Sequence, residues 1–262
     1  MEYFARIFLI GDKSNWRQII LEPEIFYLSA ATVFIAAGGY IINDYYDIKI
    51  DMINKPNRVI LNKYISRRAG IFLHIMLNVA AIVLCVWKLT INVAIFMTLC
   101  GFLLWWYSNS LKRVALWGNL AISFLAFSSL SLLALFYQVR VNAILFFSFF
   151  AFFTTLIREI IKDMEDTRGD EAFGCKTLPI VYGISRTKNI VYVIIFLTLS
   201  VLTFSIFVIN ANLYIFLAFF SFLPCLYLIV LIKNADKATD FSTVSNYTKW
   251  MMVIGIFGMV WV

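Results

Sequence analysis

The sequence contains little charge. Only 14% of its 262 residues are Asp, Glu, Lys or Arg, and 62% are hydrophobic. A soluble domain usually carries about 25% charged residues. A soluble protein of this length could not bury so much apolar surface in one core. We therefore predict that much of the chain lies in lipid, in apolar runs of roughly 20 residues each.

Histidine, proline and cysteine are also scarce, with one, four and four residues respectively. The cysteines form no CxxC pair, and three of them lie in apolar runs, so neither a disulfide framework nor a zinc site is predicted. His74, also in an apolar run, is expected to pack or bridge polar groups. The first residues lack a basic region followed by an apolar core and a small-residue cleavage site, so no signal peptide is predicted.

Eight long apolar segments are predicted to be membrane spans. A shorter run, Tyr3 to Ile10, resembles the stub of another span. Helices satisfy their backbone hydrogen bonds within lipid, and no alternating strand pattern indicates a barrel. We predict an all-α, multi-span transmembrane bundle that forms one domain over residues 1–262. The eight segments cover residues 25–42, 69–87, 91–107, 115–137, 142–161, 190–209, 213–232 and 248–262.

The basic residues are distributed unevenly between alternate connections. The net charge is +7, and 17 of the 22 Lys and Arg residues lie in 43–68, 108–114, 158–189 and 233–249. The positive-inside rule places these connections in the cytoplasm. This distribution indicates membrane orientation and not nucleic-acid binding. The connections 43–68 and 158–189 also hold most of the acidic residues, so we predict that they carry the functional residues.

Two acidic motifs with the same spacing follow apolar runs. Residues 43–51 read NDYYDIKID, and residues 163–170 read DMEDTRGD. Each contains aspartates at positions i, i+3 and i+7, which share one face of a helix. The two triplets are offset by a constant 119 residues, so we hypothesise a duplicated helical unit. The six residues are Asp44, Asp47 and Asp51, and Asp163, Asp166 and Asp170.

Like charges on one helix face repel each other, and a divalent cation would relieve that repulsion. Mg²⁺ prefers oxygen ligands and typically bridges carboxylates to substrate phosphates. Two such clusters would hold magnesium ions on one diphosphate and stabilise it as a leaving group. Basic residues beside the motifs suit phosphate binding. One motif alone would also fit a solvated helix end, and each cation alone would fit a membrane anchor.

The two motifs resemble those of the UbiA superfamily of intramembrane prenyltransferases, NDxxDxxxD and DxxDxxxD. The resemblance extends from about Gly38 to the C-terminus. It implies a bundle of about nine helices around a central cavity, with the metal site at its cytoplasmic mouth. It also implies Mg²⁺ and an isoprenyl diphosphate donor. The Tyr3–Ile10 stub would stand for a first helix that is otherwise missing.

Three further stretches are similar to one branch, the geranylgeranylglycerol-phosphate geranylgeranyltransferases. These stretches are Asn54–Arg58, Tyr107–Asn119 and Arg158–Pro179. The branch implies a glycerol-phosphate lipid precursor as the acceptor and a role in lipid biosynthesis. Lys55 departs from the pattern, because the family usually has Arg there.

On this resemblance each residue has an expected role. Asp44, Asp47, Asp163 and Asp166 would be the catalytic metal ligands, and Asp51 and Asp170 would bind magnesium directly or through water. Tyr107, with Tyr45 and Tyr46, would face the allylic cation, although an interfacial aromatic belt explains Tyr45 and Tyr46 equally well. The other predicted substrate-binding residues are Asn43, Lys55, Arg58, Lys112, Arg158, Lys162 and Lys176.

Three alternative functions fit parts of the sequence less well. An aromatic prenyltransferase of quinone or pigment biosynthesis needs a smaller, partly apolar acceptor slot, and the surplus of cations near the motifs favours a phosphorylated acceptor instead. An ion-coupled transporter usually places ionisable residues and broken helices near the midplane. Here the centres of the spans hold almost no charge, and Pro224 is the only proline within one. A non-catalytic scaffold would not need two matched acidic clusters.

Overall fold

The computed structural model describes residues 1–138, 141–208 and 221–261. Within these ranges the chain consists of helices, turns and two isolated bridges, Leu61 with Ile65 and Val114 with Lys176. The predicted all-α fold is confirmed. The Tyr3–Ile10 run forms two short helical turns, α1 (Glu2–Ala5) and η1 (Arg6–Ile10).

The chain divides into two compact units. The first, here called the α3–α5 unit, comprises Ile20–Ala121 and Arg168–Thr177. The second, here called the terminal unit, comprises Met1–Ile19, Ile122–Thr167 and Leu178–Val262. The single domain predicted from the sequence stays a prediction.

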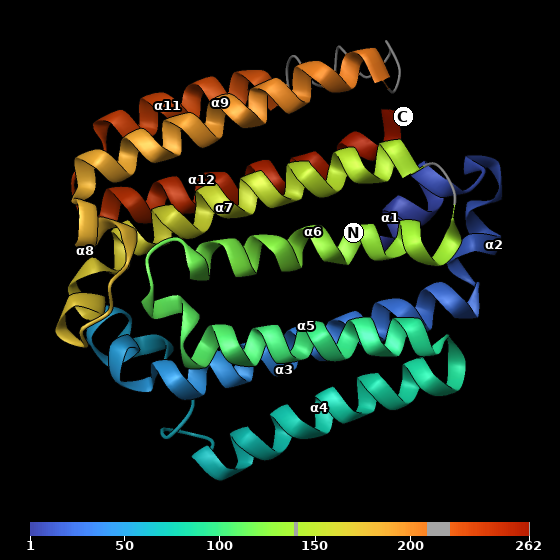
Figure 1. Ribbon diagram of the computed structural model, residues 1–262, viewed down its shortest axis with the longest axis horizontal. Coiled ribbons are helices and arrows are strands. Elements are labelled where there is room, and N and C mark those ends of the chain that lie inside the picture. Colours follow the sequence, from blue (N-terminus) through green and yellow to red (C-terminus); the bar gives the residue numbers. More distant parts are fainter. Residues whose placement is uncertain (139–140, 209–220, 262) are drawn as a thin grey trace. The chain divides into compact units, whose positions relative to one another are not determined.

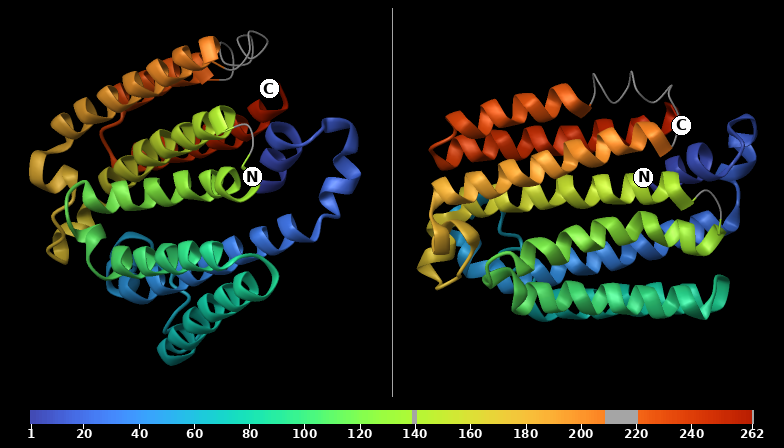
Figure 2. Two further views of the ribbon diagram at one scale, coloured as in Figure 1. Left: turned by 45° about the vertical axis from the view of Figure 1, so that its right-hand side comes forward. Right: turned by 45° about the horizontal axis from the view of Figure 1, so that its top comes forward.

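Three long helices build the α3–α5 unit: α3 (Pro23–Asn54), α4 (Arg67–Lys88) and α5 (Ile91–Asn109). Pro23 begins α3, where its missing N–H costs no hydrogen bond. The side chains of Ser66 and Thr90 cap α4 and α5 by accepting backbone N–H bonds. α3 packs against both other helices, and α4 packs against α5 (Figure 1; Figure 2).

Two glycines allow these three helices to approach closely. A Cβ at Gly38 would lie 2.7 Å from the Asn78 amide nitrogen, and one at Gly101 would lie 2.5 Å from its oxygen. The ring nitrogen Nδ1 of His74 lies 2.8 Å from the Gly38 carbonyl oxygen, so His74 bridges α4 to α3 as expected. Small residues at such positions are typical of helix packing in membranes.

The terminal unit contains α1, η1 and η2 (Lys13–Asn15). It also contains most of α2 (Trp16–Ile20), α6 (Trp117–Tyr137) and α7 (Val141–Ala172). Its later helices are α8 (Leu178–Tyr182), α9 (Ile184–Val208), α11 (Leu223–Asn234), α12 (Ala238–Phe257) and η6 (Gly258–Trp261). The Tyr247 hydroxyl donates to the Pro224 carbonyl and ties α12 to α11. Phe150 of α7 lies against Gly255 of α12, where no side chain would fit without a shift.

Six described helices are long and apolar enough to cross a membrane, and each corresponds to a predicted segment. They are Pro23–Asn54, Arg67–Lys88, Ile91–Asn109, Trp117–Tyr137, Asn142–Ala172 and Ile184–Phe204. The predicted segment 213–232 falls partly outside the described residues, and its described part is α11. The segment 248–262 corresponds to the second half of α12 and η6, which are not among the six.

Candidate active site

The first aspartate motif occupies the last third of α3, as its spacing predicted. Asp44 is exposed, whereas Asp47 and Asp51 are half-buried. The helix continues without a break from the apolar run through the motif and ends at Asn54. All three carboxylates are therefore positioned by a rigid helix, one turn apart.

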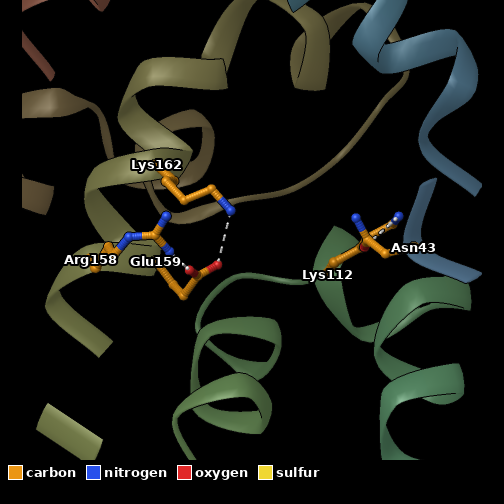
Figure 3. Close-up of polar contacts among 5 residues, drawn as sticks. All are labelled: Asn43, Lys112, Arg158, Glu159 and Lys162. Atoms are coloured by element: carbon orange, nitrogen blue, oxygen red, sulfur yellow. Dashed lines mark hydrogen bonds and ion pairs between the residues drawn. The ribbon is translucent and has the colours of Figure 1, made fainter. Parts of the chain in front are cut away.

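Lys112 is a partner of this motif. It lies in the short turn η4 (Leu111–Arg113), and its Nζ donates to Asp47 over 2.5 Å. The same ammonium donates to the Asn43 amide oxygen over 3.4 Å (Figure 3). The Lys112 and Asp47 side chains are only 10% and 16% exposed. Burial lowers the pKa of Lys112, and the Asp47 carboxylate opposes that shift. The predicted site residues Asn43, Asp47 and Lys112 therefore form one cluster.

The second motif lies on α7, again on a continuous helix. Asp163 and Asp166 belong to the terminal unit, and Asp170 belongs to the α3–α5 unit. The end of this motif contacts the end of the first, because the Gly169 N–H donates to the Asn54 side-chain oxygen over 2.9 Å. Asp170 thus lies in the same compact unit as Asp44, Asp47 and Asp51. The approach of Asp163 and Asp166 to them stays a prediction.

A tight turn after α7 brings Lys176 to the η4 turn. Gly174 adopts a φ of +68°, which glycine tolerates without strain and which reverses the chain. The Cys175 N–H then donates to the Asp170 carbonyl, and the Lys176 N–H donates to the Arg113 carbonyl over 2.8 Å. The predicted residue Lys176 therefore lies beside Arg113, with its own side chain exposed.

Cys175 marks the place where charges from both motifs gather. Its side chain is buried, and burial is the main cause of the raised pKa of its thiol. The carboxylates of Asp170 and Asp47 also raise this pKa, while Arg113 and Lys112 oppose them. One aspartate of each motif and two cations therefore influence the pKa of the same thiol within the α3–α5 unit.

In the terminal unit, Arg158 and Lys162 share a carboxylate. The Arg158 guanidinium donates to Glu159 over 2.8 Å, and the Lys162 ammonium lies 3.4 Å from its other oxygen (Figure 3). Glu159 itself is buried. The carboxylate holds both predicted phosphate-binding cations on one turn of α7, directly before Asp163.

The remaining predicted residues lie in α3, directly after it, or near the end of α5. Lys55 caps the C-terminus of α3, and its N–H donates to the Asp51 carbonyl over 2.7 Å. Tyr107 is half-buried near the end of α5. The backbone of Arg58 lies in η3 (Pro56–Arg58), and its side chain is outside the described set. The Tyr45 ring has the Arg67 guanidinium 4.6 Å above it, which suits an interfacial role.

Four residues of this region were not among the predicted site residues: Asn54, Arg113, Glu159 and Cys175. Glu159 had a readable signal, since it lies three residues before Lys162, the spacing of an intrahelical ion pair. Asn54, Arg113 and Cys175 acquire their neighbours only through contacts between distant segments.

The donor set suits magnesium in its chemistry. Carboxylate oxygens are the ligands that Mg²⁺ prefers, and the Lys112 ammonium already places one positive charge against Asp47. Within the described ranges, no three or more His, Cys, Asp or Glu side chains are gathered into a metal site by themselves. The six aspartates are candidate ligands through their chemistry and their shared helix faces.

A family model for the UbiA prenyltransferases matches residues 12–253. The chain belongs to the UbiA prenyltransferase family. It is therefore a membrane prenyltransferase, as the motifs predicted.

Two digeranylgeranylglyceryl phosphate synthases are similar over most of their length. The Methanobrevibacter smithii protein is 36% identical over 244 residues, which are 89% of this chain and 85% of that protein. The Korarchaeum cryptofilum protein is 33% identical over an alignment of 266 residues that covers 98% of this chain and 92% of that protein.

Solved structures show the same fold. A structure from work on digeranylgeranylglyceryl phosphate synthase in membranes has a TM-score of 0.71 and 24% identity, covering 99% of this chain and 89% of its own. A UbiA homologue from Archaeoglobus fulgidus, bound to GPP and Mg²⁺, has a TM-score of 0.65 and 15% identity, covering 90% and 87%. The UbiA fold predicted from the motifs is confirmed.

Proposed function

We propose that this UbiA-family enzyme transfers a prenyl group from an isoprenyl diphosphate to the hydroxyl of a glycerol-phosphate lipid precursor, with Mg²⁺ as cofactor. The observation that carries the proposal is that Asp170 of the second motif lies in the same compact unit as the three aspartates of the first. The names of the similar synthases support the acceptor, and the Mg²⁺- and GPP-bound homologue supports the metal and the donor class.

The donor diphosphate is assigned to the aspartate motifs and their cations. Magnesium held by the six aspartates would neutralise charge on the leaving pyrophosphate. Lys112, held beside Asn43 and Asp47, would place an ammonium at the diphosphate. Arg158 and Lys162, paired with the buried Glu159, would supply a guanidinium fork and a second ammonium. Lys55 and Arg58 are proposed to bind the same group.

The reaction exchanges one C–O bond for another. The bond between the allylic carbon and the diphosphate oxygen breaks, and the pyrophosphate keeps the electron pair. The acceptor hydroxyl oxygen forms the new ether bond to that carbon and releases its proton. A pocket that excludes water protects the allylic cation until the acceptor attacks, and Tyr107 is proposed to stabilise that cation through its ring.

The phosphate of the acceptor is assigned to Arg113 and Lys176. Their backbones are joined by the hydrogen bond between the Lys176 N–H and the Arg113 carbonyl, and both side chains are exposed. Two cations on adjacent segments suit a phosphate monoester. An uncharged aromatic acceptor would gain nothing from them.

The enzyme is proposed to lie in the cell membrane with both motifs at the cytoplasmic face. The six candidate spans support membrane insertion, and the excess of Lys and Arg in the motif-bearing connections supports this orientation.

A transfer assay with purified protein tests the proposal. Prenyl diphosphates of several lengths are offered with glycerol-phosphate lipid acceptors and with aromatic acceptors, and the products are identified by mass spectrometry. We expect an ether-linked product, its loss in EDTA and its loss in Asp44→Ala and Asp163→Ala. Retained activity in either variant contradicts the metal site. A product formed only with aromatic acceptors contradicts the acceptor and leaves the prenyltransferase assignment intact.

A further inference from the structure

Asn54 joins the two aspartate motifs at their ends. It is the last residue of α3, three positions after Asp51, and its side-chain oxygen accepts the N–H of Gly169, one position before Asp170. The two residues are 115 positions apart in the chain. Both lie in the α3–α5 unit, so the contact is internal to one compact body.

Glycine at position 169 makes this contact possible. Gly169 is buried, and a Cβ there would lie 2.4 Å from the Asn54 amide nitrogen and 2.5 Å from its carbon and oxygen. Real Cβ atoms do not approach neighbours so closely, so any larger residue would push Asn54 away. The approach therefore depends on one small residue on α7 and one short amide on α3.

We propose that Asn54 is a positioning residue for the metal site, which fixes the second motif against the first through Gly169. This inference rests on the proposed function. Asp170 directly follows Gly169, and its carbonyl accepts the Cys175 N–H, so the bond also orients the turn that carries Lys176. Asp51 precedes Asn54 by about one helical turn. Movement at this bond changes the distance between the Asp51 and Asp170 carboxylates.

A neutral amide suits this position. The α3–α5 unit contains four of the motif carboxylates, and like charges repel one another until cations bind. Asn54 accepts a backbone hydrogen bond and adds no further negative charge. Its contribution is therefore to hold the ligands in place before the metal arrives, which raises metal affinity by pre-organisation.

Direct Mn²⁺ binding tests this role without relying on turnover. Mn²⁺ prefers the same oxygen ligands as Mg²⁺, and its binding to purified protein with inorganic pyrophosphate is followed by electron paramagnetic resonance. We expect Asn54→Ala and Gly169→Ala to weaken Mn²⁺ binding about tenfold, the loss of one well-formed hydrogen bond. The matched control is Asn78→Ala, which removes an interhelical asparagine of the same unit far from the motifs in the chain. It should lower the unfolding temperature and leave the Mn²⁺ affinity unchanged.

A reversible tether provides the rescue. In a Cys175→Ser background, the double variant Asn54→Cys/Gly169→Cys replaces the hydrogen bond with a disulfide that can be opened. Oxidised protein should regain Mn²⁺ affinity within about twofold of the parent, and reduced protein should resemble Asn54→Ala. Equal affinities in the two redox states, or failure of the disulfide to form, would overturn the inference. So would an Asn54→Ala variant with parental affinity.

The proposed function and this inference fail in different ways. If the parent protein binds no Mn²⁺ with pyrophosphate, or if Asp44→Ala binds it normally, the metal site itself is wrong. If the parent binds Mn²⁺ through Asp44 but Asn54→Ala binds it equally well, only the positioning role is wrong.

Discussion

The ammonium of Lys112 lies 2.5 Å from a carboxylate oxygen of Asp47, and the two residues come from η4 and α3. The pair is largely buried and also includes the amide oxygen of Asn43. Removing one partner of such a pair leaves the other without compensation, which costs more than the pair itself contributes. The η4 turn and the first motif are thus coupled.

Lys112→Met should therefore impair both the site and the fold around it. We expect kcat/KM for the prenyl diphosphate to fall about 10²-fold, because the uncompensated Asp47 and the lost diphosphate contact act together. The measurement is steady-state transfer in detergent or liposomes at saturating acceptor.

Lys63→Met is the matched control, since Lys63 is an exposed lysine of the same unit with no assigned role. It should retain activity within about threefold of the parent, the size of an ordinary surface effect. A Lys112→Met enzyme as active as Lys63→Met would show that the ammonium has no part in donor binding.

Glu159→Gln should weaken the contacts that position the Arg158 and Lys162 side chains before the second motif. Arg158 and Lys162 share the Glu159 carboxylate, and the glutamine amide would accept one of these bonds and repel the other donor. We expect KM for the donor to rise about fivefold, because removing a charge-assisted bond costs about 1 kcal/mol or more. Glu171→Gln, on an exposed position of the same helix, should leave KM unchanged. An unchanged KM in both variants would limit Glu159 to a structural role.

The sequence predicted the helical parts of this fold well. Apolar runs of membrane length have few alternatives to a helix in lipid, and the i, i+3, i+7 spacing required the aspartates to continue those helices. α3 and α7 do so, since each runs unbroken from its apolar stretch through its motif. His74 was also predicted correctly, because a lone polar ring in an apolar segment needs a nearby partner.

The contacts of the site were harder to predict, because they depend on tertiary structure. Nothing local to Asn54 indicates a bond to a glycine 115 residues away. Cys175 was expected to be neither a disulfide partner nor a zinc ligand, and the Gly174 turn brings it to charges from both motifs. Long-range electrostatic neighbours of this kind are fixed by packing and are invisible to helical periodicity.

Gly101→Ala should destabilise the α3–α5 unit. The new Cβ would lie 2.5 Å from the Asn78 oxygen, and overpacking of this kind typically costs about 1–3 kcal/mol. The unfolding temperature in detergent should fall, and Asn78→Ala/Gly101→Ala should be destabilised by less than the sum of the single variants, since both changes act on one contact. Additive effects would mean that the Asn78 side chain does not fill the space above Gly101.

Alkylation of Cys175 against pH should report the charges around the site. Burial raises the pKa of its thiol, so less thiolate is present at neutral pH than for an exposed cysteine. An exposed Lys63→Cys reference should reach half of its maximal labelling rate near pH ~8.5. The midpoint of the Cys175 profile should lie at higher pH, as measured by mass spectrometry of the labelled peptides. A Cys175 midpoint at or below that of the reference would contradict the burial of the thiol.

Two variants then shift this profile in opposite directions, and the signs follow from charge. Asp170→Asn removes a carboxylate that disfavours the thiolate, so the midpoint should move to lower pH. Lys112→Met removes an ammonium that favours the thiolate, so the midpoint should move to higher pH. Only a sulfur atom near residues of both the second motif and the η4 turn responds to both changes. If Asp170→Asn leaves the midpoint in place, the second motif does not end beside Cys175. That result would contradict the proposal that aspartates of both motifs belong to one site.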